Sequence, residues 1–197
     1  MEKKTISELR SVVMEKMSIV RGTAHSFEHV ERVCEIAALL ARNENADLEL
    51  VQLGAILHDV GRAVGEPHNE TGAELAREIL ENINYPSEKV ERIAKIVMRH
   101  RQSLGQGLET LEEKIVWDAD KIDLIGVTGI LRAFHWSGSM KIPFEDEVEW
   151  CRERETTFYG LLKTETAKKI ARRRHEAMIH FLEVLEVELS LADLLID

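Results

Sequence analysis

The chain has 197 residues, of which 44% are apolar, and its formal net charge is −10 at pH 7. This length suits one domain, and the apolar share is sufficient for a core without disulfide bonds. The acidic balance argues against duplex DNA or RNA as a partner, because an acidic surface repels the phosphate backbone. It does not exclude a small anionic substrate, which a metal ion and a few cations can attract locally.

The cysteines and the N-terminal residues exclude further classes of protein. Cys34 and Cys151 lie in helix-like stretches and form no CxxC pair, which favours a reducing, cytoplasmic location. The N-terminal stretch MEKKTISELRSVV lacks a long apolar core and a small-residue cleavage site, so we expect no secretory signal. Because no run of roughly 18 or more apolar residues occurs, we also expect no membrane partner.

Apolar residues at helical spacing predict an all-α chain from its first part onward. A first helix is expected over residues 5–20 and a second over residues 30–41. Asp47 is the predicted N-cap of a third helix, which runs to Val60 and stops near Gly61.

The same spacing predicts helices through the middle of the chain. A fourth helix is expected over residues 69–83, and Pro86 opens a fifth that continues to His100. Residues 103–107 are predicted as a loop, and a sixth helix starts near Thr110.

The remaining chain is expected to form shorter helices after Gly126 and then one long C-terminal helix. Four apolar residues of that last helix form a stripe that we assign to the core: Met178, Phe181, Leu182 and Leu185.

The most informative local pattern is His58-Asp59 at the end of an apolar helix, in the stretch AILHDVG. Burying an imidazole and a carboxylate is costly unless both have partners. A divalent metal ion satisfies both at once, since neutral imidazole nitrogen and carboxylate oxygen are common ligands. Adjacent helical residues point about 100° apart. The break at Gly61 would let both reach one ion.

Other polar residues lie where they could complete a site. His29 stands at the start of the second helix, and Asp120 lies in the cluster WDADKID of an otherwise apolar helix. His68 and His100 stand at helix ends. Plainer interpretations exist for each: a helix-terminal His58-Asp59 ion pair, a solvated Asp120, and histidines that only begin or end helices.

The ordered set of motifs resembles the HD-domain superfamily of metal-dependent phosphohydrolases. The stretches HSFEHVERV, LGAILHDVGR, HNETGAELA, VWDADKIDLIG and TETAKKIARRRHEAM are similar to its small stand-alone bacterial and archaeal branch. The resemblance implies one HD domain over residues 1–197, a helical bundle around a buried metal site. Its motif-bearing core would cover about 20–125, with the C-terminal helices, 126–197, packed on that core.

The resemblance also implies the ligands. His29, His58, Asp59 and Asp120 would hold one metal ion, and the histidines that hold a second ion in binuclear members correspond to His68 and His100. The cofactor would be a divalent ion, with Mn, Fe, Co, Ni, Zn and Mg all compatible with mixed His and Asp ligands.

This chain departs from better-known branches of the superfamily. VGRA follows His58-Asp59, without the Glu-Asp pair of (p)ppGpp hydrolases. Arg101-Gln102 follows His100, without the Gly-Tyr-Pro signature of cyclic-di-GMP phosphodiesterases. Ser26 stands where this branch usually has an aspartate.

Roles follow for residues next to the ligands. Asp59 would accept a proton from water while holding the metal, and Arg62 and Lys121 would face the phosphate; these three are the predicted catalytic residues. The predicted substrate-binding residues are His25, Arg62, Arg99, Lys121 and Asp123. Asp123, one turn after Asp120, could orient either a metal ligand or a ribose hydroxyl.

The sequence thus predicts hydrolysis of a phosphate ester or anhydride in a small molecule, with a nucleotide as first choice and both nucleotidase and pyrophosphohydrolase activity open. One alternative is a di-iron oxygenase of the same fold, which would use all six ligands. Another is a non-catalytic sensor that binds a nucleotide. The oligomeric state stays open, a homodimer included.

Overall fold

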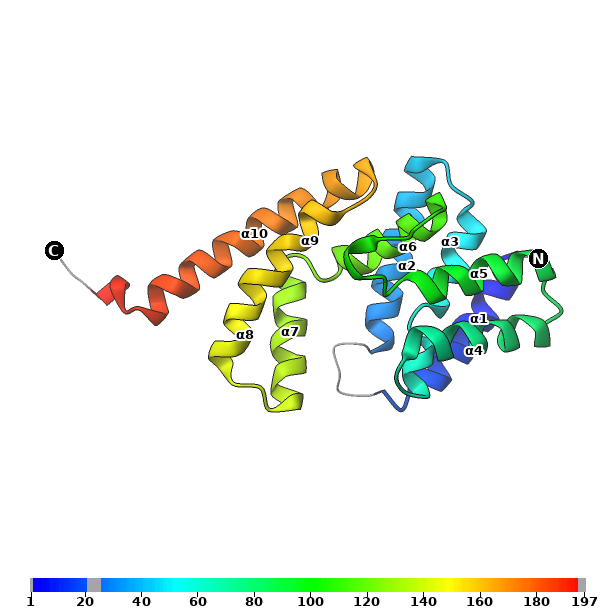
Figure 1. Ribbon diagram of the computed structural model, residues 1–197, viewed down its shortest axis with the longest axis horizontal. Coiled ribbons are helices and arrows are strands. Elements are labelled where there is room, and N and C mark those ends of the chain that lie inside the picture. Colours follow the sequence, from blue (N-terminus) through cyan, green and yellow to red (C-terminus); the bar gives the residue numbers. More distant parts are fainter. Residues whose placement is uncertain (1, 21–25, 195–197) are drawn as a thin grey trace.

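A computed structural model describes residues 2–20 and 26–194, and helices follow one another through both ranges (Figure 1). No strand occurs in these two ranges, which confirms the all-α expectation. No helix in the described part of the chain is both long and apolar enough to cross a lipid bilayer.

The α-helices are α1 (Glu2–Met17), α2 (Phe27–Glu44), α3 (Leu48–Leu57), α4 (His68–Asn82), α5 (Ser87–Arg99), α6 (Leu111–Ile122), α7 (Val127–Met140), α8 (Phe144–Trp150), α9 (Thr156–Leu161) and α10 (Glu165–Leu189). Short 3₁₀ turns are η1 (Val60–Ala63), η2 (Ser103–Gly105) and η4 (Ala192–Leu194), and a π-helical turn, Cys151–Glu155, joins α8 to α9.

Two predicted helix starts are confirmed in atomic detail. The Asp47 side chain accepts a hydrogen bond from the Leu50 backbone N–H and so caps α3. Thr110 caps α6 in a capping box with Glu113. The predicted end of the third helix was late: α3 stops at Leu57, and the next residues turn into η1 instead of continuing to Val60.

The main core lies among α1 to α6 and buries large apolar side chains such as Leu57, Ile93 and Trp117. The start of α10 joins it through Ala167 and Ala171. Helices α2 to α6 and the turns that follow them carry six of the predicted site residues: His29, His58, Asp59, His68, His100 and Asp120.

A smaller apolar cluster holds the C-terminal helices together. It contains Ile130, Ala133, Cys151, Met178 and Leu182, which come from α7, the π-helical turn and α10. The assignment of Phe181 to the core was wrong, because its side chain is exposed. The far end of α10 projects away from the main core, as Figure 1 shows, so part of this helix faces solvent.

Buried polar contacts attach the C-terminal helices to the main core. The Asp118 carboxylate accepts hydrogen bonds from the backbone N–H groups of Lys163 and Thr164 and from the Thr164 hydroxyl. These bonds fix the turn between α9 and α10 against α6. Asp118 therefore has a structural role in the acidic cluster that it shares with Asp120.

A close approach of two glycines sets the position of η1 against α4. A Cβ atom on Gly61 would lie 2.0 Å from the His68 carbonyl oxygen and 2.6 Å from the Gly72 nitrogen. Both neighbours are backbone atoms, which cannot rotate away. Only glycine therefore lets the segment after Asp59 lie so near His68.

We predict that Gly61→Ala destabilises the protein by about 1–3 kcal/mol or more, because the added methyl group must push η1 and α4 apart. Thermal and chemical denaturation would measure the change. Gly138→Ala is the matched control: Gly138 lies in α7, and a Cβ atom added there would meet nothing within 4 Å apart from its own helix. That control should be neutral or stabilise by up to about 1 kcal/mol, and equal stability of the two variants would contradict the assigned contact.

Candidate metal centre

The His58-Asp59 pair follows a helix that is buried on every side, since α3 contributes seven buried residues from Leu50 to Leu57. His58 caps the end of α3, and its Nδ1 donates a hydrogen bond to the Ala55 carbonyl oxygen at 2.7 Å. Asp59 then leaves the helical path at φ −103° and ψ 6°. This change of direction lets the two adjacent side chains reach the same place.

A first group of ligand atoms forms where α2, α3 and α6 meet. One ligand atom from each of His29, His58 and Asp120 lies within 4.8 Å of the other two, and all three residues are buried. The His29 Nε2 atom lies 3.4 Å from His58 Nε2 and 3.3 Å from Asp120 Oδ1. The sequence-predicted residues are therefore brought together from positions far apart in the chain.

A second group lies next to the first and consists of Asp59, His68 and His100. Asp59 Oδ1 lies 3.4 Å from His68 Nε2 and 3.5 Å from His100 Nε2. The other oxygen, Oδ2, lies 3.8 Å from His29 Nε2 and 3.7 Å from His58 Nε2. One carboxylate thus faces both groups, one oxygen to each.

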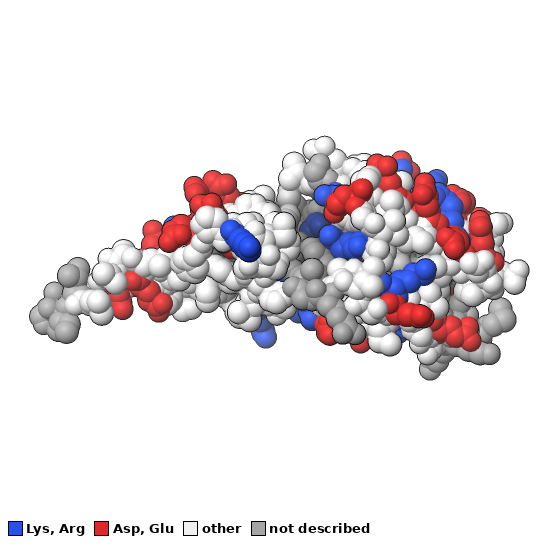
Figure 2. Space-filling view, turned by 90° about the horizontal axis from the view of Figure 1, so that it is seen from below, with Lys and Arg blue, Asp and Glu red and all other residues white. Residues whose placement is uncertain are grey.

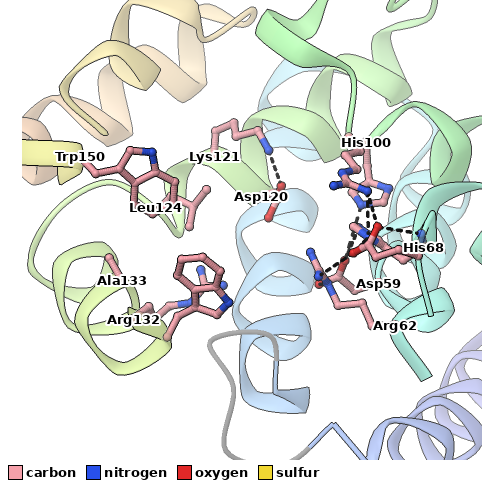
Figure 3. Close-up of a pocket in the computed structure, with 13 residues that line it drawn as sticks. Asp59, Arg62, His68, His100, Asp120, Lys121, Leu124, Arg132, Ala133 and Trp150 are labelled. Carbon is pink, nitrogen blue, oxygen red and sulfur yellow. Dashed lines mark hydrogen bonds and ion pairs between the residues drawn. The ribbon is translucent and has the colours of Figure 1, made fainter. Parts of the chain in front are cut away.

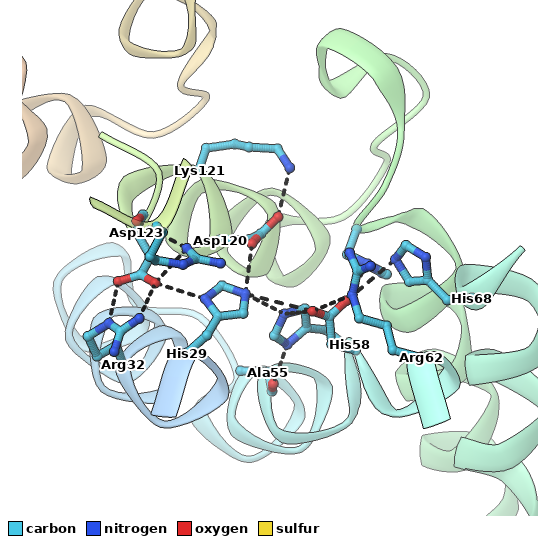
Figure 4. A network of polar contacts seen from close by, with 12 residues as sticks. His29, Arg32, Ala55, His58, Arg62, His68, Asp120, Lys121 and Asp123 are labelled. Atoms are coloured by element: carbon cyan, nitrogen blue, oxygen red, sulfur yellow. Dashed lines mark hydrogen bonds and ion pairs between the residues drawn. The ribbon is translucent and has the colours of Figure 1, made fainter. Parts of the chain in front are cut away.

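All four imidazoles are held by their Nδ1 atoms, which leaves every Nε2 atom directed toward the site, as Figure 4 shows for His29, His58 and His68. His29 Nδ1 lies 2.8 Å from Asp123 Oδ2, and His100 Nδ1 donates to the Val97 carbonyl oxygen at 2.6 Å. His68 Nδ1 lies 3.0 Å from Glu66 Oε1. A partner on Nδ1 fixes the ring orientation and favours the tautomer in which Nε2 can bind a metal.

Burial keeps two of these rings in the neutral form that a metal requires. Desolvation is the main cause that lowers the pKa of His58 to about 4, and desolvation together with the Arg62 charge lowers the pKa of His68 to about 4. Burial opposes ionisation of Asp120, but Lys121 and His29 hold the pKa of its carboxyl well below the usual range. His58 and His68 are therefore neutral donors, and Asp120 is an ionised one. Burial lowers the pKa of His29, but hydrogen bonds to Asp120 and Asp123 outweigh burial and raise it, so a metal ion would have to displace a proton from this ring.

The residues present fit a divalent metal ion. Buried polar atoms normally have partners, yet His68 Nε2 is buried with no hydrogen-bond partner among the described residues. It points at Asp59 instead (Figure 3). Imidazole nitrogen and carboxylate oxygen at this spacing form a mixed donor set that suits several divalent ions.

Asp123 lies behind His29 and does not line the pocket. Its carboxylate is fully buried, binds His29 Nδ1, and receives 2.7–3.0 Å hydrogen bonds from the guanidinium groups of Arg32 and Arg132. Two cations therefore balance one buried carboxylate. Of the two roles expected of Asp123, this geometry favours the orientation of a metal ligand, His29.

A pocket of about 330 Å³ opens beside the two groups. Four cations line it, namely Arg62, Arg101, Lys121 and Arg132. Figure 2 shows that basic side chains gather near the middle of the molecule, while acidic side chains are spread over its ends. Three carboxylates, Asp59, Glu66 and Asp120, line the same pocket, so its cations outnumber its carboxylates by one.

The predicted phosphate-facing cations both line this pocket, and each also binds a candidate ligand. Arg62 Nε lies 2.8 Å from Asp59 Oδ2. Lys121 Nζ lies 2.7 Å from Asp120 Oδ2 and sits over the rings of Trp117 and Phe158. Both cations therefore line the pocket beside the ligand carboxylates with which they pair.

The structure does not place Arg99 or His25, two predicted substrate-binding residues, at the pocket, for different reasons. Arg99 is not brought to the pocket, since its guanidinium binds Glu109 and Glu113 on another side of α5. His25 lies outside the described residues.

Sequence reasoning missed Arg32, Arg132, Trp136 and Trp150. Arg32 stands one turn after His29 on the same face of α2, a spacing that could have revealed it. Arg132 lies among apolar residues in the stretch GILRAF, where a buried arginine implies a buried acid. The two tryptophans carried no local signal of their place in the pocket.

The chain is similar to one known family and to several solved structures. The model of the HD domain family matches residues 26–125, which is slightly more than half of the chain. The uncharacterized protein YpgQ of Bacillus subtilis is 27% identical over 179 residues, which span 85% of this chain and 86% of YpgQ.

Solved structures agree with this match. The crystal structure of YpgQ has a TM-score of 0.81 at 25% identity and covers 95% of this chain and 96% of that chain. A YpgQ structure in complex with ADP has a TM-score of 0.79 at 24% identity and covers 93% of this chain and 97% of its own. A predicted HD superfamily hydrolase from an uncultured Thermotogales bacterium is 28% identical, with a TM-score of 0.70 and coverage of 93% and 92%.

We predict that Asp123→Asn weakens binding of a divalent metal about 10- to 100-fold, although it removes no ligand, because His29 loses the carboxylate that orients it. Competitive titration with a chelating dye would measure the affinity. His180→Ala, an exposed histidine of α10, is the control and should bind metal like the unmodified protein. Unchanged affinity in Asp123→Asn would contradict the orienting role.

Proposed function

Because the chain belongs to the HD domain family, we propose that it is a metal-dependent phosphohydrolase that acts on a small phosphorylated molecule, with a nucleotide as first choice. The single observation that carries this proposal is the arrangement around Asp59. Its two oxygens face two groups of buried metal-ligand atoms, and those groups adjoin a pocket lined by four cations.

The proposed ligands follow from the two groups. His29, His58, Asp59 and Asp120 would hold one divalent ion, and Asp59 would share a second ion with His68 and His100. When bound there, such ions supply Lewis acidity, which polarises phosphoryl oxygens and lowers the pKa of water.

The protein side chains supply charge and position. Arg62, Lys121 and Arg101 line the pocket, where they would bind the non-bridging oxygens of a phosphate and balance the charge that grows during its transfer. Asp59 would accept the proton that water loses. The buried Asp123 would keep His29 in place throughout.

The pocket dimensions and one relative support a nucleotide as substrate. About 330 Å³ lies within the usual range for small-molecule sites, roughly 300–1,000 Å³. YpgQ, which is 27% identical to this chain, has been crystallised with ADP. Both a phosphomonoester and a pyrophosphate bond of a nucleotide remain within the proposal.

The six-ligand arrangement also favours a second candidate, a di-iron oxygenase. That enzyme would contain iron and would consume oxygen while converting a substrate without phosphate. Phosphate release under anaerobic conditions would exclude oxygenation as the main activity. Tight metal binding with no turnover on a broad phosphate panel would instead favour the nucleotide-binding sensor.

We predict phosphate or pyrophosphate release from at least one nucleotide in a screen of nucleotides and sugar phosphates with several divalent metals. Excess chelator should abolish it, and His58→Ala and Asp59→Ala should each lower turnover by at least about 100-fold, since they remove a ligand and the proton acceptor. His180→Ala is again the control. Full activity in Asp59→Ala would place the reaction elsewhere.

We also predict that the protein binds two equivalents of metal and that His100→Ala binds one. The substitution removes a nitrogen from the group around Asp59 Oδ1 and leaves His29, His58 and Asp120 intact. Elemental analysis after desalting would give the stoichiometry. Two equivalents in His100→Ala, or one in the unmodified protein, would contradict a second ion at this position.

A further inference from the structure

The pocket has two chemically different ends. Figure 3 places Asp59, Arg62, His68 and His100 on one side, Trp150, Leu124, Ala133 and Arg132 on the other, with Asp120 and Lys121 between them. Trp136 also lines the second side. One end therefore suits phosphate and metal, and the other is largely apolar and aromatic.

The aromatic end is made by two tryptophans from adjacent helices. Trp136 lies near the end of α7 and Trp150 ends α8, and their ring centroids are 5.8 Å apart with planes inclined by 32°. Both side chains are half-buried and open to the pocket. The remaining tryptophan of the chain, Trp117, is fully buried in the main core. Both accessible indoles thus stand at the pocket.

An indole offers a wide, flat apolar face, and the face of a nucleobase stacks on it. A sugar phosphate without a base has no such surface to bury. Asp120 and Lys121 lie between the two ends, where the sugar and phosphates that join a base to the metal-facing end would lie.

We propose that Trp136 and Trp150 form a stacking subsite for the base of a nucleotide, so that the enzyme selects nucleotides over phosphorylated molecules without a base. This inference rests on the proposed phosphohydrolase function. It assigns the substrate class to side chains outside the metal centre.

The test uses adenosine as well as ADP, because adenosine carries no phosphate and binds without turnover. Ligand-observed NMR would measure binding to the full chain, and kcat/KM would be compared for nucleotides and ribose 5-phosphate. Trp136→Leu and Trp150→Leu keep an apolar side chain and remove the stacking face. The phenylalanine variants at both positions keep an aromatic ring.

We expect each leucine variant to weaken adenosine and ADP binding on the order of 10- to 100-fold and to leave ribose 5-phosphate turnover nearly unchanged. The phenylalanine variants should stay within about threefold of the unmodified protein, as stacking persists. Phe181→Leu, which changes an exposed aromatic residue of α10 outside the pocket, is the matched control and should have no effect.

Three results would overturn the subsite: no saturable adenosine or ADP binding, normal binding in both leucine variants, or equal losses for ADP and ribose 5-phosphate. Equal losses for the two compounds would mean that the tryptophan pair only stabilises the packing of α7 against α8. The outcomes separate the two proposals. If no phosphate ester is hydrolysed but adenosine binding depends on both indoles, the hydrolase function fails and the subsite stands. If nucleotides are hydrolysed but both leucine variants bind adenosine normally, the subsite fails and the hydrolase function stands.

Discussion

Four imidazoles and two carboxylates are buried around one point of this protein, and the rest of the structure must compensate for that burial. Polar groups removed from water are unfavourable unless they are paired. Asp59 lies at the centre, with one oxygen facing each group of histidines. Each surrounding helix from α2 to α6 brings either a ligand side chain or a neighbour that orients one. The apolar core excludes water, and the proposed metal ions would complete the charge balance.

The compensation extends beyond the ligands to the C-terminal helices. Asp123 connects His29 to Arg32 of α2 and to Arg132 of α7. Because Arg132 also lines the pocket, α7 is tied to the metal centre and to the substrate side by one residue. The same helix carries Trp136, so the proposed base subsite is positioned by the network that orients a metal ligand.

The sequence was sufficient for the helices and for much of the candidate site, because both depend on local patterns. Periodic apolar residues mark α2 to α6, and the caps Asp47 and Thr110 lie where their side chains predict. The sequence was insufficient where the direction of a side chain decides whether the residue reaches the site. Arg99 and His100 are adjacent, and adjacent helical residues point about 100° apart, so only His100 reaches Asp59. The roles of Arg132 and Trp150 depend on contacts between distant helices, which periodicity does not encode.

The anchoring of the histidine rings would affect how the protein binds a metal ion. His58 Nδ1 donates to the Ala55 carbonyl oxygen and His100 Nδ1 to the Val97 carbonyl oxygen, in each case three residues earlier. Each ring is thus held by the last turn of the helix that precedes it. These bonds form within the polypeptide and require no ion. The candidate ligands are therefore preorganised, and little conformational entropy would be lost on metal uptake. Exchange of one ion for another would proceed as a local substitution inside a standing framework, without a folding step.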